Sequence, residues 1–455
     1  MKYLLAIFLL FSGAVCGQGI DPGDKPWENP AVTGIGKELP RTQLTPYASQ
    51  ADAIARTPGT TAYVRMMEDE WSFADGGFTS AFIMPFAWID RQMFLRVPSI
   101  QGPYVVTVND TAVGYSQDGR SPVEFDITKI AKEGRNTVRI TVIDGAPSAK
   151  TLENYKKPVA IPVPAGVCVV AQPRIRVREI VYSSSFTDGD GYLQLGVAVK
   201  SHLLNVKQVR VHYELLAPDG KSVATSYRDS KFEMRDEDTV RFFERVPAVK
   251  MWSPAEPSLY TLVVKSQAEG RYTEYVAAKI GFRTLEVEGG KIIINGTDAR
   301  LNVVEFTPTG DLAKDEAQVQ TLKRTGANTL KLLPCPQSEA FYAMCDRLGV
   351  YLIDQANVDT HAAGDSRKLG GNPSNDPAWT AAFVDRAVTM YRCSQLHPSV
   401  ILYSLAANSA NGFCLYESYR ALKALDTGRP VIYLQNAREW NSDAVSLSAG
   451  ALRMK

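Results

Sequence analysis

The 455-residue sequence lacks a charge excess, a cysteine pair at metal-binding spacing and, beyond its first residues, any long apolar run. Its 50 basic and 49 acidic residues leave a net charge of +1, which argues against a nucleic-acid-binding protein or a polybasic membrane binder. After residue 17 no stretch of about 18 apolar residues occurs, so we expect no membrane-spanning helix there. The near-neutral charge is compatible with an uncharged ligand such as a sugar.

The six cysteines are scattered along the chain, and none belongs to a Cys-x-x-Cys pair. Zinc sites need closely spaced cysteines, and disulfide-stabilised scaffolds need an even, paired set. The sequence favours neither of these two classes. We expect the cysteines that follow Cys16 to behave as small buried apolar side chains. They are Cys168, Cys335, Cys345, Cys393 and Cys414.

The N-terminus combines a basic residue, the apolar stretch Leu4–Phe11 and a run of small residues. This pattern is typical of a secretory signal peptide. We therefore predict that residues 1–17 are removed by cleavage before Gln18 and that the protein is exported, to the periplasm or the extracellular space. Two alternatives stay open, an uncleaved N-terminal membrane anchor and a lipid-modified Cys16.

The length predicts roughly three domains, at about 150 residues for each. Residues 18–60 are rich in Pro, Gly and Thr and are expected to form an extended arm. Residues 61–173 contain short β-rich runs separated by turn residues, which is typical of an all-β sandwich. Residues 174–283 alternate apolar and polar side chains with a period of two, over a length typical of an immunoglobulin-like sandwich.

Residues 284–455 change to strands that alternate with helices, which predicts parallel β-α-β units. The expected strands are 300–305, 329–333, 350–354, 400–405, 430–434 and 444–448. The expected helices are 314–324, 338–348, 378–391 and 414–425. A (β/α)8 barrel needs about 250 residues. We therefore expect a barrel that is short by two or three β-α units.

A series of short motifs occurs along the chain in one characteristic order. They are Trp27-Glu28-Asn29-Pro30, Val113-Gly114-Tyr115-Ser116-Gln117-Asp118, Trp252-Ser253, Gly281-Phe282-Arg283, Asn295-Gly296, Cys345-Asp346-Arg347, Asp354-Gln355-Ala356-Asn357, His397-Pro398-Ser399-Val400-Ile401 and Arg429-Pro430-Val431. With these motifs the sequence resembles family 2 glycoside hydrolases, most closely the large bacterial β-galactosidases. The resemblance implies a jelly-roll β-sandwich, an immunoglobulin-like β-sandwich and an incomplete (β/α)8 TIM barrel, with a role in carbohydrate metabolism.

The resemblance also identifies the position of the acid/base residue. A retaining glycosidase needs two carboxyl groups about 5–5.5 Å apart, one as acid/base and one as nucleophile. The family acid/base is a Glu that follows the fourth barrel strand, where residues 403–409 here read Tyr-Ser-Leu-Ala-Ala-Asn-Ser. Asn408 takes the place of that Glu, and an amide cannot give up a proton near neutral pH. The family nucleophile belongs to the seventh strand, for which we find no counterpart.

Other positions at which the family binds sugar also differ in this sequence. The resemblance places Ser80, Lys156, Glu305, Lys331, Asp354 and Ala407 at or near the family pocket. Residues that shape turns and strands match the family, whereas residues that contact sugar or perform chemistry do not. This pattern predicts a fold that is retained without catalysis.

One fragment of a metal site is kept. Residues 357–361, Asn-Val-Asp-Thr-His, resemble the family segment in which a Glu and a His bind magnesium together with the acid/base Glu. Here Asp359 and His361 remain, and the third ligand would be Asn408. Magnesium prefers hard oxygen ligands in octahedral geometry, so this set predicts a weak site. We favour the alternative, a hydrogen-bonded Asp–His pair at the end of a strand.

These observations lead to one main hypothesis and two alternatives. We predict a non-catalytic family member that binds a β-galactoside-like carbohydrate or a protein partner. The first alternative is an active glycosidase, with a site rewired from Glu305, Asp354 and Asp359 or completed by another polypeptide. The second is a truncated gene product whose open half-barrel needs a partner or an oligomer to cover its strand edge.

Overall fold

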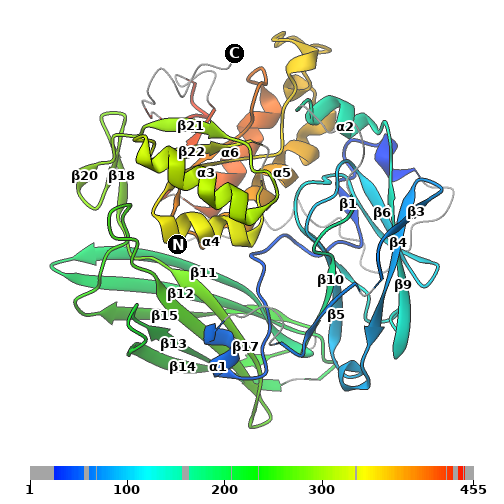
Figure 1. The fold of residues 1–455 in the computed structure, drawn as a ribbon, viewed down its shortest axis with the longest axis horizontal. Coiled ribbons are helices and arrows are strands. Elements are labelled where there is room, and N and C mark those ends of the chain that lie inside the picture. Colours follow the sequence, from blue (N-terminus) through cyan, green and yellow to red (C-terminus); the bar gives the residue numbers. More distant parts are fainter. Residues whose placement is uncertain are drawn as a thin grey trace.

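The computed structural model describes residues 25–55, 61–67, 69–155, 163–205, 207–233, 235–333, 336–426, 428–433, 439–443 and 445. Two β-sandwiches and a layer of parallel strands with helices follow one another along the chain (Figure 1). Nowhere in these ranges is there a helix of sufficient length and apolar character to span a membrane. The predicted signal peptide, Lys156, Cys335 and all but one residue of the strand expected at 444–448 lie outside the described residues.

The first sandwich packs a six-stranded sheet, in the order β1-β7-β6-β9-β4-β3, against a four-stranded sheet, in the order β2-β10-β5-β8. Apolar side chains of both sheets form its core, with Phe82, Leu95 and Phe125 fully buried. Asn109 and Asp110 both adopt positive φ in the two-residue turn between β6 and β7, as tight hairpins require. The elements of the N-terminal arm and of this sandwich, in chain order, are η1 Pro26–Glu28, β1 Gly34–Ile35, α1 Gln50–Ala55, β2 Val64–Met66, β3 Ser72–Ala74, β4 Gly77–Met84, η2 Phe86–Trp88, β5 Gln92–Val97, β6 Tyr104–Val108, β7 Thr111–Ser116, β8 Val123–Asp126, β9 Gly134–Val142, α2 Pro147–Leu152 and β10 Cys168–Gln172.

The second sandwich packs a three-stranded sheet, β11-β12-β15, against a four-stranded sheet, β14-β13-β16-β17. The period of two in the sequence is visible in its strands: Val209, Val211 and Tyr213 of β13 point into the core, and their neighbours face outward. The strands are β11 Ile175–Thr187, β12 Asp190–Ser201, β13 Lys207–Leu216, β14 Ser222–Phe232, β15 Glu237–Val246, β16 Tyr260–Ala268 and β17 Arg271–Ile280.

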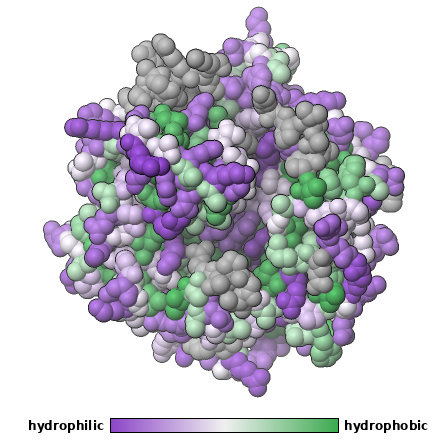
Figure 2. Space-filling model, viewed as in Figure 1, coloured by the Kyte–Doolittle hydropathy of each residue, from purple (hydrophilic) through white to green (hydrophobic). Residues whose placement is uncertain are grey.

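The remaining chain forms a small antiparallel sheet and then five parallel strands in the strict order β21-β22-β23-β24-β25, which is part of a TIM barrel. Helices α3–α6 cover its outer face and share one apolar core with the strands. Figure 2 shows hydrophilic and hydrophobic residues intermixed over one face of the molecule, without a broad apolar area. The elements are β18 Leu285–Glu288, β19 Lys291–Ile294, β20 Thr297–Asp298, β21 Val303–Phe306, α3 Leu312–Arg324, β22 Thr329–Leu332, α4 Glu339–Leu348, β23 Tyr351–Gln355, η3 His361–Ala363, η4 Pro373–Asn375, η5 Pro377–Trp379, α5 Thr380–Ser394, β24 Val400–Ser404, α6 Phe413–Leu425 and β25 Val431–Ile432.

Local chemistry sets the ends of these elements. The strand expected from residue 300 begins at Val303, because Arg300 takes a positive φ in a turn capped by the Asp298 carboxylate. Asp311 and Ser338 cap the N-termini of α3 and α4 through their side-chain oxygens. The four described cysteines after Cys16 are free and buried, which confirms that prediction for Cys168, Cys345, Cys393 and Cys414.

The N-terminal arm joins all three bodies. The Arg41 guanidinium donates to the Glu124 carboxylate (2.7 Å) in the first sandwich and to the backbone oxygen of Arg178 (2.9 Å) in the second. The Lys37 ammonium donates to Asp385 on α5 (2.8 Å). The arm is therefore held by charged contacts at several points along its length.

The motif Gly281-Phe282-Arg283 forms the junction between the second sandwich and the barrel. The Arg283 guanidinium donates to the backbone oxygens of Pro398 (2.8 Å) and Val400 (2.9 Å). A Cβ at Gly281 would lie 2.8 Å from the Pro398 ring and 2.9 Å from Trp252, so no side chain fits there. These contacts of Gly281 and Arg283 hold the end of the second sandwich against the segment that leads into β24.

His397 closes a buried charged cluster beneath α4. Its Nδ1 lies 2.6 Å from Asp346 Oδ2 and its Nε2 lies 3.0 Å from Glu339 Oε2. Burial alone would lower the pKa of His397, but the carboxylates of Asp346 and Glu339 outweigh it and raise the pKa to about 10. The imidazolium therefore holds α4 against the loop that leads into β24.

We predict that His397→Gln destabilises the protein most strongly at low pH. The folded-state pKa of His397 is raised above its ordinary value of 6.5. The stabilisation that the protonated imidazole gives to the folded state is therefore complete below pH 6.5 and is lost as the pH rises toward about 10. Urea unfolding at pH 6 should show a loss of about 3 kcal/mol relative to the wild type. The difference should shrink at pH 9, and a difference that grows with pH would contradict this assignment.

Candidate functional site

The carboxyl ends of parallel strands converge at one edge of the barrel, where this fold carries its functional groups. Segments that follow β23 and β24 meet there. The backbone nitrogen of Ala407 donates to Val358 (2.8 Å), and that of Thr360 donates to the backbone oxygen of Asn408 (3.2 Å). These two bonds extend the strand pairing beyond the strands themselves. They bring the side chains of Asp359 and Asn408 together.

Asp359, His361 and Asn408 form a hydrogen-bonded trio. The Asp359 carboxylate is almost fully buried. Its Oδ1 accepts from the backbone nitrogen of His361 (3.1 Å) and lies 2.8 Å from the imidazole Nδ1, while its Oδ2 accepts from the amide nitrogen of Asn408 (3.1 Å). The His361 side chain is 56% exposed. Both carboxylate oxygens are thus engaged by nitrogen groups of the chain.

This trio does not fit a magnesium ion. It offers one carboxylate, one imidazole and one amide, and both carboxylate oxygens already have partners. Magnesium prefers several hard oxygen ligands in octahedral geometry. Within the described ranges there is no group of three or more His, Cys, Asp and Glu side chains that could hold a metal ion.

Glu305 and Lys331 form an ion pair on adjacent strands. They face each other in the register of β21 and β22, with Nζ and Oε1 3.0 Å apart. The Lys331 side chain is only 1% exposed, whereas that of Glu305 is 40% exposed. A buried ammonium group needs a partner for its charge. The Glu305 carboxylate therefore serves to compensate the charge of the buried Lys331 ammonium group.

Asp354 faces away from the barrel interior. It is fully buried and accepts from the Tyr342 hydroxyl at 2.9 and 3.0 Å, so it is directed at helix α4. Because side chains alternate along a strand, Gln355 faces the opposite way, on the side of Ile353 in the barrel interior. The amide nitrogen and oxygen of Gln355 are both buried and form no hydrogen bond in the described structure. The sequence analysis selected Asp354 and missed Gln355, which the strand period identifies.

The other predicted pocket positions lie in different surroundings. Ala407 is buried directly beside Asn408. Ser80 lies on β4, on the same face as the core residues Phe78 and Phe82, and its hydroxyl donates to the backbone oxygen of Asp69 (2.7 Å). Among the described residues no hydrogen bond links Ser80 to the barrel. The structure thus brings Ala407, Asn408, Asp359 and His361 together and leaves Ser80 apart from them.

A buried polar network joins this edge of the barrel to the first sandwich. The Arg386 guanidinium of α5 donates to Gln117 Oε1 (2.9 Å) and to Glu153 Oε1 (3.2 Å). The Asn357 amide donates to Asp118 Oδ1 (2.8 Å) and to Glu153 Oε1 (3.2 Å). All five residues are at most 2% exposed. Burial alone would lower the pKa of Arg386, but the charges of Asp118 and Glu153 raise it above its usual value.

The same contact region holds the segment that carries Asp359. The backbone nitrogen of Asp359 donates to Leu152 (2.7 Å), and the backbone nitrogen of Asn154 donates back to Asp359 (3.0 Å). Glu153 lies between these two residues and belongs to the network around Arg386. The position of the trio therefore depends on how the first sandwich docks on the barrel.

Comparison with known families identifies each part of this architecture. A family model described as the sugar binding domain of glycosyl hydrolases family 2 matches residues 71–155. A model described as glycosyl hydrolases family 2 matches residues 175–283, and one described as the TIM barrel domain of that family matches residues 286–451. The chain belongs to glycoside hydrolase family 2. Its membership rests on three consecutive matches that follow the order of the observed bodies.

Relatives of this family 2 chain carry the names of glycosidases. A β-galactosidase of Halalkalibacterium halodurans is 30% identical over 375 residues, which are 79% of this chain and 36% of that protein. A putative β-galactosidase structure of Bacteroides fragilis aligns with 90% of this chain and 66% of its own, with TM-score 0.67 and 14% identity. A β-glucuronidase structure of Bacteroides uniformis aligns with 88% of this chain and 53% of its own chain, with TM-score 0.66 and 14% identity. The chain spans about a third of the length of the curated relatives that it matches.

We predict that Asn408→Asp destabilises the protein in a metal-free buffer. The substitution removes the amide donor from Asp359 and places a second carboxylate beside a buried one, at a cost of about 1–3 kcal/mol. Two carboxylates and His361 would form a better oxygen site, so magnesium should restore part of the lost thermal stability. Asn408→Ala is the matched control, because it loses the hydrogen bond without adding charge. An equal magnesium response of both variants would contradict the interpretation.

We also predict that Arg386→Gln is strongly destabilising, because Asp118 and Glu153 would remain buried without their cation. Removal of one partner from a buried charged network costs about 3–5 kcal/mol. The control is Arg367→Gln, which breaks a pair with Glu439 that is 46% exposed on the arginine side and should cost under about 1 kcal/mol. Equal urea midpoints for the two variants would overturn the role assigned to Arg386.

Proposed function

We propose that this chain is a carbohydrate-binding member of family 2 that does not carry out retaining hydrolysis by the family mechanism. The observation that carries the proposal is Asn408, which follows β24 and which the resemblance to family 2 aligns with the acid/base Glu. An amide has no proton to transfer to a leaving oxygen near neutral pH. This limit holds irrespective of how the rest of the barrel is completed.

The three carboxyl groups considered for a rewired site are poorly suited to replace the missing acid. Asp359 is buried and accepts hydrogen bonds on both oxygens. Glu305 compensates the buried ammonium of Lys331, and Asp354 is directed at Tyr342 on the helical side. A retaining glycosidase needs one protonated acid and one ionised nucleophile on opposite sides of the same bond. These three carboxylates support other roles better.

Binding of a neutral sugar is better supported than its cleavage. Gln355 presents an amide without a partner inside the barrel, and Asn408 is only partly buried. Amides both donate and accept hydrogen bonds, which suits the hydroxyl groups of a sugar. The match to the family's sugar binding domain and the β-galactosidase names of relatives favour a β-galactoside-like ligand.

The test compares turnover and binding in the purified chain. We expect no hydrolysis of nitrophenyl β-galactoside or nitrophenyl β-glucuronide above the buffer rate. We expect saturable calorimetric binding of a non-hydrolysable thiogalactoside, weakened by about tenfold in Gln355→Leu, which removes the amide hydrogen bonds but keeps a similar volume. The matched control is Gln320→Leu, since Gln320 lies exposed on α3.

Three outcomes decide between the proposal and an active glycosidase. Turnover that scales with the amount of purified protein, and that is abolished by Asp359→Ala or Glu305→Gln, would favour a rewired site. Turnover that persists in both variants points to a contaminating enzyme and leaves the proposal standing if binding is observed. Absence of both turnover and binding would refute carbohydrate binding in the barrel.

A further inference from the structure

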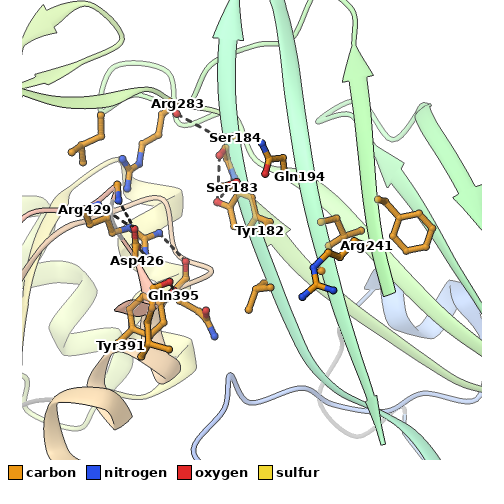
Figure 3. A pocket seen from close by; sticks show the side chains of 18 of the residues that line it. Tyr182, Ser183, Ser184, Gln194, Arg241, Arg283, Tyr391, Gln395, Asp426 and Arg429 are labelled. Atoms are coloured by element: carbon orange, nitrogen blue, oxygen red, sulfur yellow. Dashed lines mark hydrogen bonds and ion pairs between the residues drawn. The ribbon is translucent and has the colours of Figure 1, made fainter. Parts of the chain in front are cut away.

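A cavity of about 490 Å³ lies between the second sandwich and the barrel (Figure 3). Its barrel wall includes Gln395, which precedes β24, and Arg429, which precedes β25. The cavity therefore opens at the amino ends of the parallel strands. Asp359 and Asn408 follow their strands, so they lie at the other edge of the barrel. A volume of this size is typical of small-molecule sites, which span roughly 300–1,000 Å³.

The sheet wall of the cavity is the outward face of β11-β12-β15. Strand register places Ser183 opposite Gln194, and Gly196 opposite Arg241. The side chains of Ser183 and Gln194 are exposed and line the cavity. A Cβ at Gly196 would lie 2.8 Å from a methyl group of Val181, so the neighbouring strands pack closely over this glycine. This wall thus offers a hydroxyl, an amide and a guanidinium to a ligand.

Arg241 is the cation available on this wall. Its one hydrogen bond in the described structure is to the backbone oxygen of Thr239 (3.2 Å), and the side chain is exposed. Figure 3 shows Arg241 and Gln395 reaching into the gap from opposite walls. A guanidinium carries five N–H donors in a planar fork that matches carboxylate and sulfate-like oxygens.

The charges around the cavity are unbalanced. Three arginines line it, Arg241, Arg283 and Arg429, against the single carboxylate of Asp426. Asp426 accepts from the backbone of Gly428 (2.7 Å) and lies 3.6 Å from the Arg429 guanidinium. Arg283 donates to backbone oxygens, and no described carboxylate pairs with it. Burial, together with the charge of Arg429, lowers the pKa of Arg283 to about 10.

We propose that this cavity is a second ligand site, for a saccharide unit that carries a carboxylate or a sulfate group. Arg241 binds the anionic group, and Ser183 and Gln194 bind the sugar hydroxyls. The excess of guanidinium groups favours an anionic saccharide over a neutral one. The site is separate from the barrel site under the proposed function and does not depend on it.

The test titrates the purified full chain by isothermal calorimetry with methyl glucuronide, methyl galacturonide, galactose 6-sulfate, methyl galactoside and inorganic sulfate. At least one acidic sugar should bind about tenfold or more tightly than methyl galactoside and inorganic sulfate, since a hydrogen-bonded charge contributes about 1.5–3 kcal/mol. Comparison of the uronides with the sulfated sugar identifies the anionic group. The affinity should fall as salt is raised.

Variants assign the binding to this cavity. Arg241→Gln and the nearly isosteric Gln194→Glu should each weaken the acidic sugar by about tenfold or more. Arg271→Gln makes the same charge change at an exposed position on β17 and should leave the affinity unchanged. Asp359→Asn in the barrel should also leave it unchanged.

Several results would overturn the proposal. They are no saturable binding of any acidic sugar, equal affinity for acidic and neutral sugars, equal affinity for inorganic sulfate alone, and equal loss in Arg241→Gln and Arg271→Gln. Arg241 and Gln194 are exposed, so the thermal midpoints of their variants should match the wild type. If Arg241→Gln fails to fold, Gln194→Glu alone decides between these outcomes.

Discussion

The buried guanidinium of Arg386 is the interaction on which the arrangement of the barrel and the first sandwich depends. It lies on a barrel helix, and it donates to Gln117 and Glu153 of the sandwich and its connecting segment. A charge removed from water is tolerated only where partners of opposite charge and hydrogen-bond acceptors surround it. The contact therefore exists in one geometry, and that geometry places the segment after β23 against Leu152 and Asn154.

The docking of the first sandwich on the barrel explains why Asp359 is hydrogen-bonded to His361 and Asn408. The carboxylate is carried into a buried position by backbone hydrogen bonds to the first sandwich, so its charge must be compensated locally. A second carboxylate at position 408 would repel it unless a cation lay between them. Asn408 removes the repulsion and donates a hydrogen bond in its place. The amide at position 408 thus gives the buried Asp359 carboxylate a local partner without a metal ion.

The architecture could be predicted because it depends on patterns among residues that are close together in the sequence. Alternation in residues 209–215 and the Asn109-Asp110 turn are properties of a few adjacent residues, and the sandwiches were predicted from them. The order of motifs predicted the family. The site was harder to predict, because it depends on side-chain direction. Asp354 and Gln355 are neighbours in sequence but face opposite sides of β23. An error of one residue in the alternation along the strand exchanges the side chain that faces the barrel interior with the one that faces the helices.

The cavity next to Arg241 could not be predicted from the sequence for a different reason. Its walls come from β11, β12 and β15 and from residues that precede β24 and β25, and no local pattern links them. The junction that creates it is fixed by Arg283 and Gly281, which set the distance between the sandwich and the barrel. Arg283 donates to backbone oxygens rather than to a carboxylate, so it adds a positive charge to the cavity wall. Among the described residues that line the cavity at the amino ends of the strands, three guanidinium groups therefore face one carboxylate, whereas at the carboxyl ends each charge considered has a local partner.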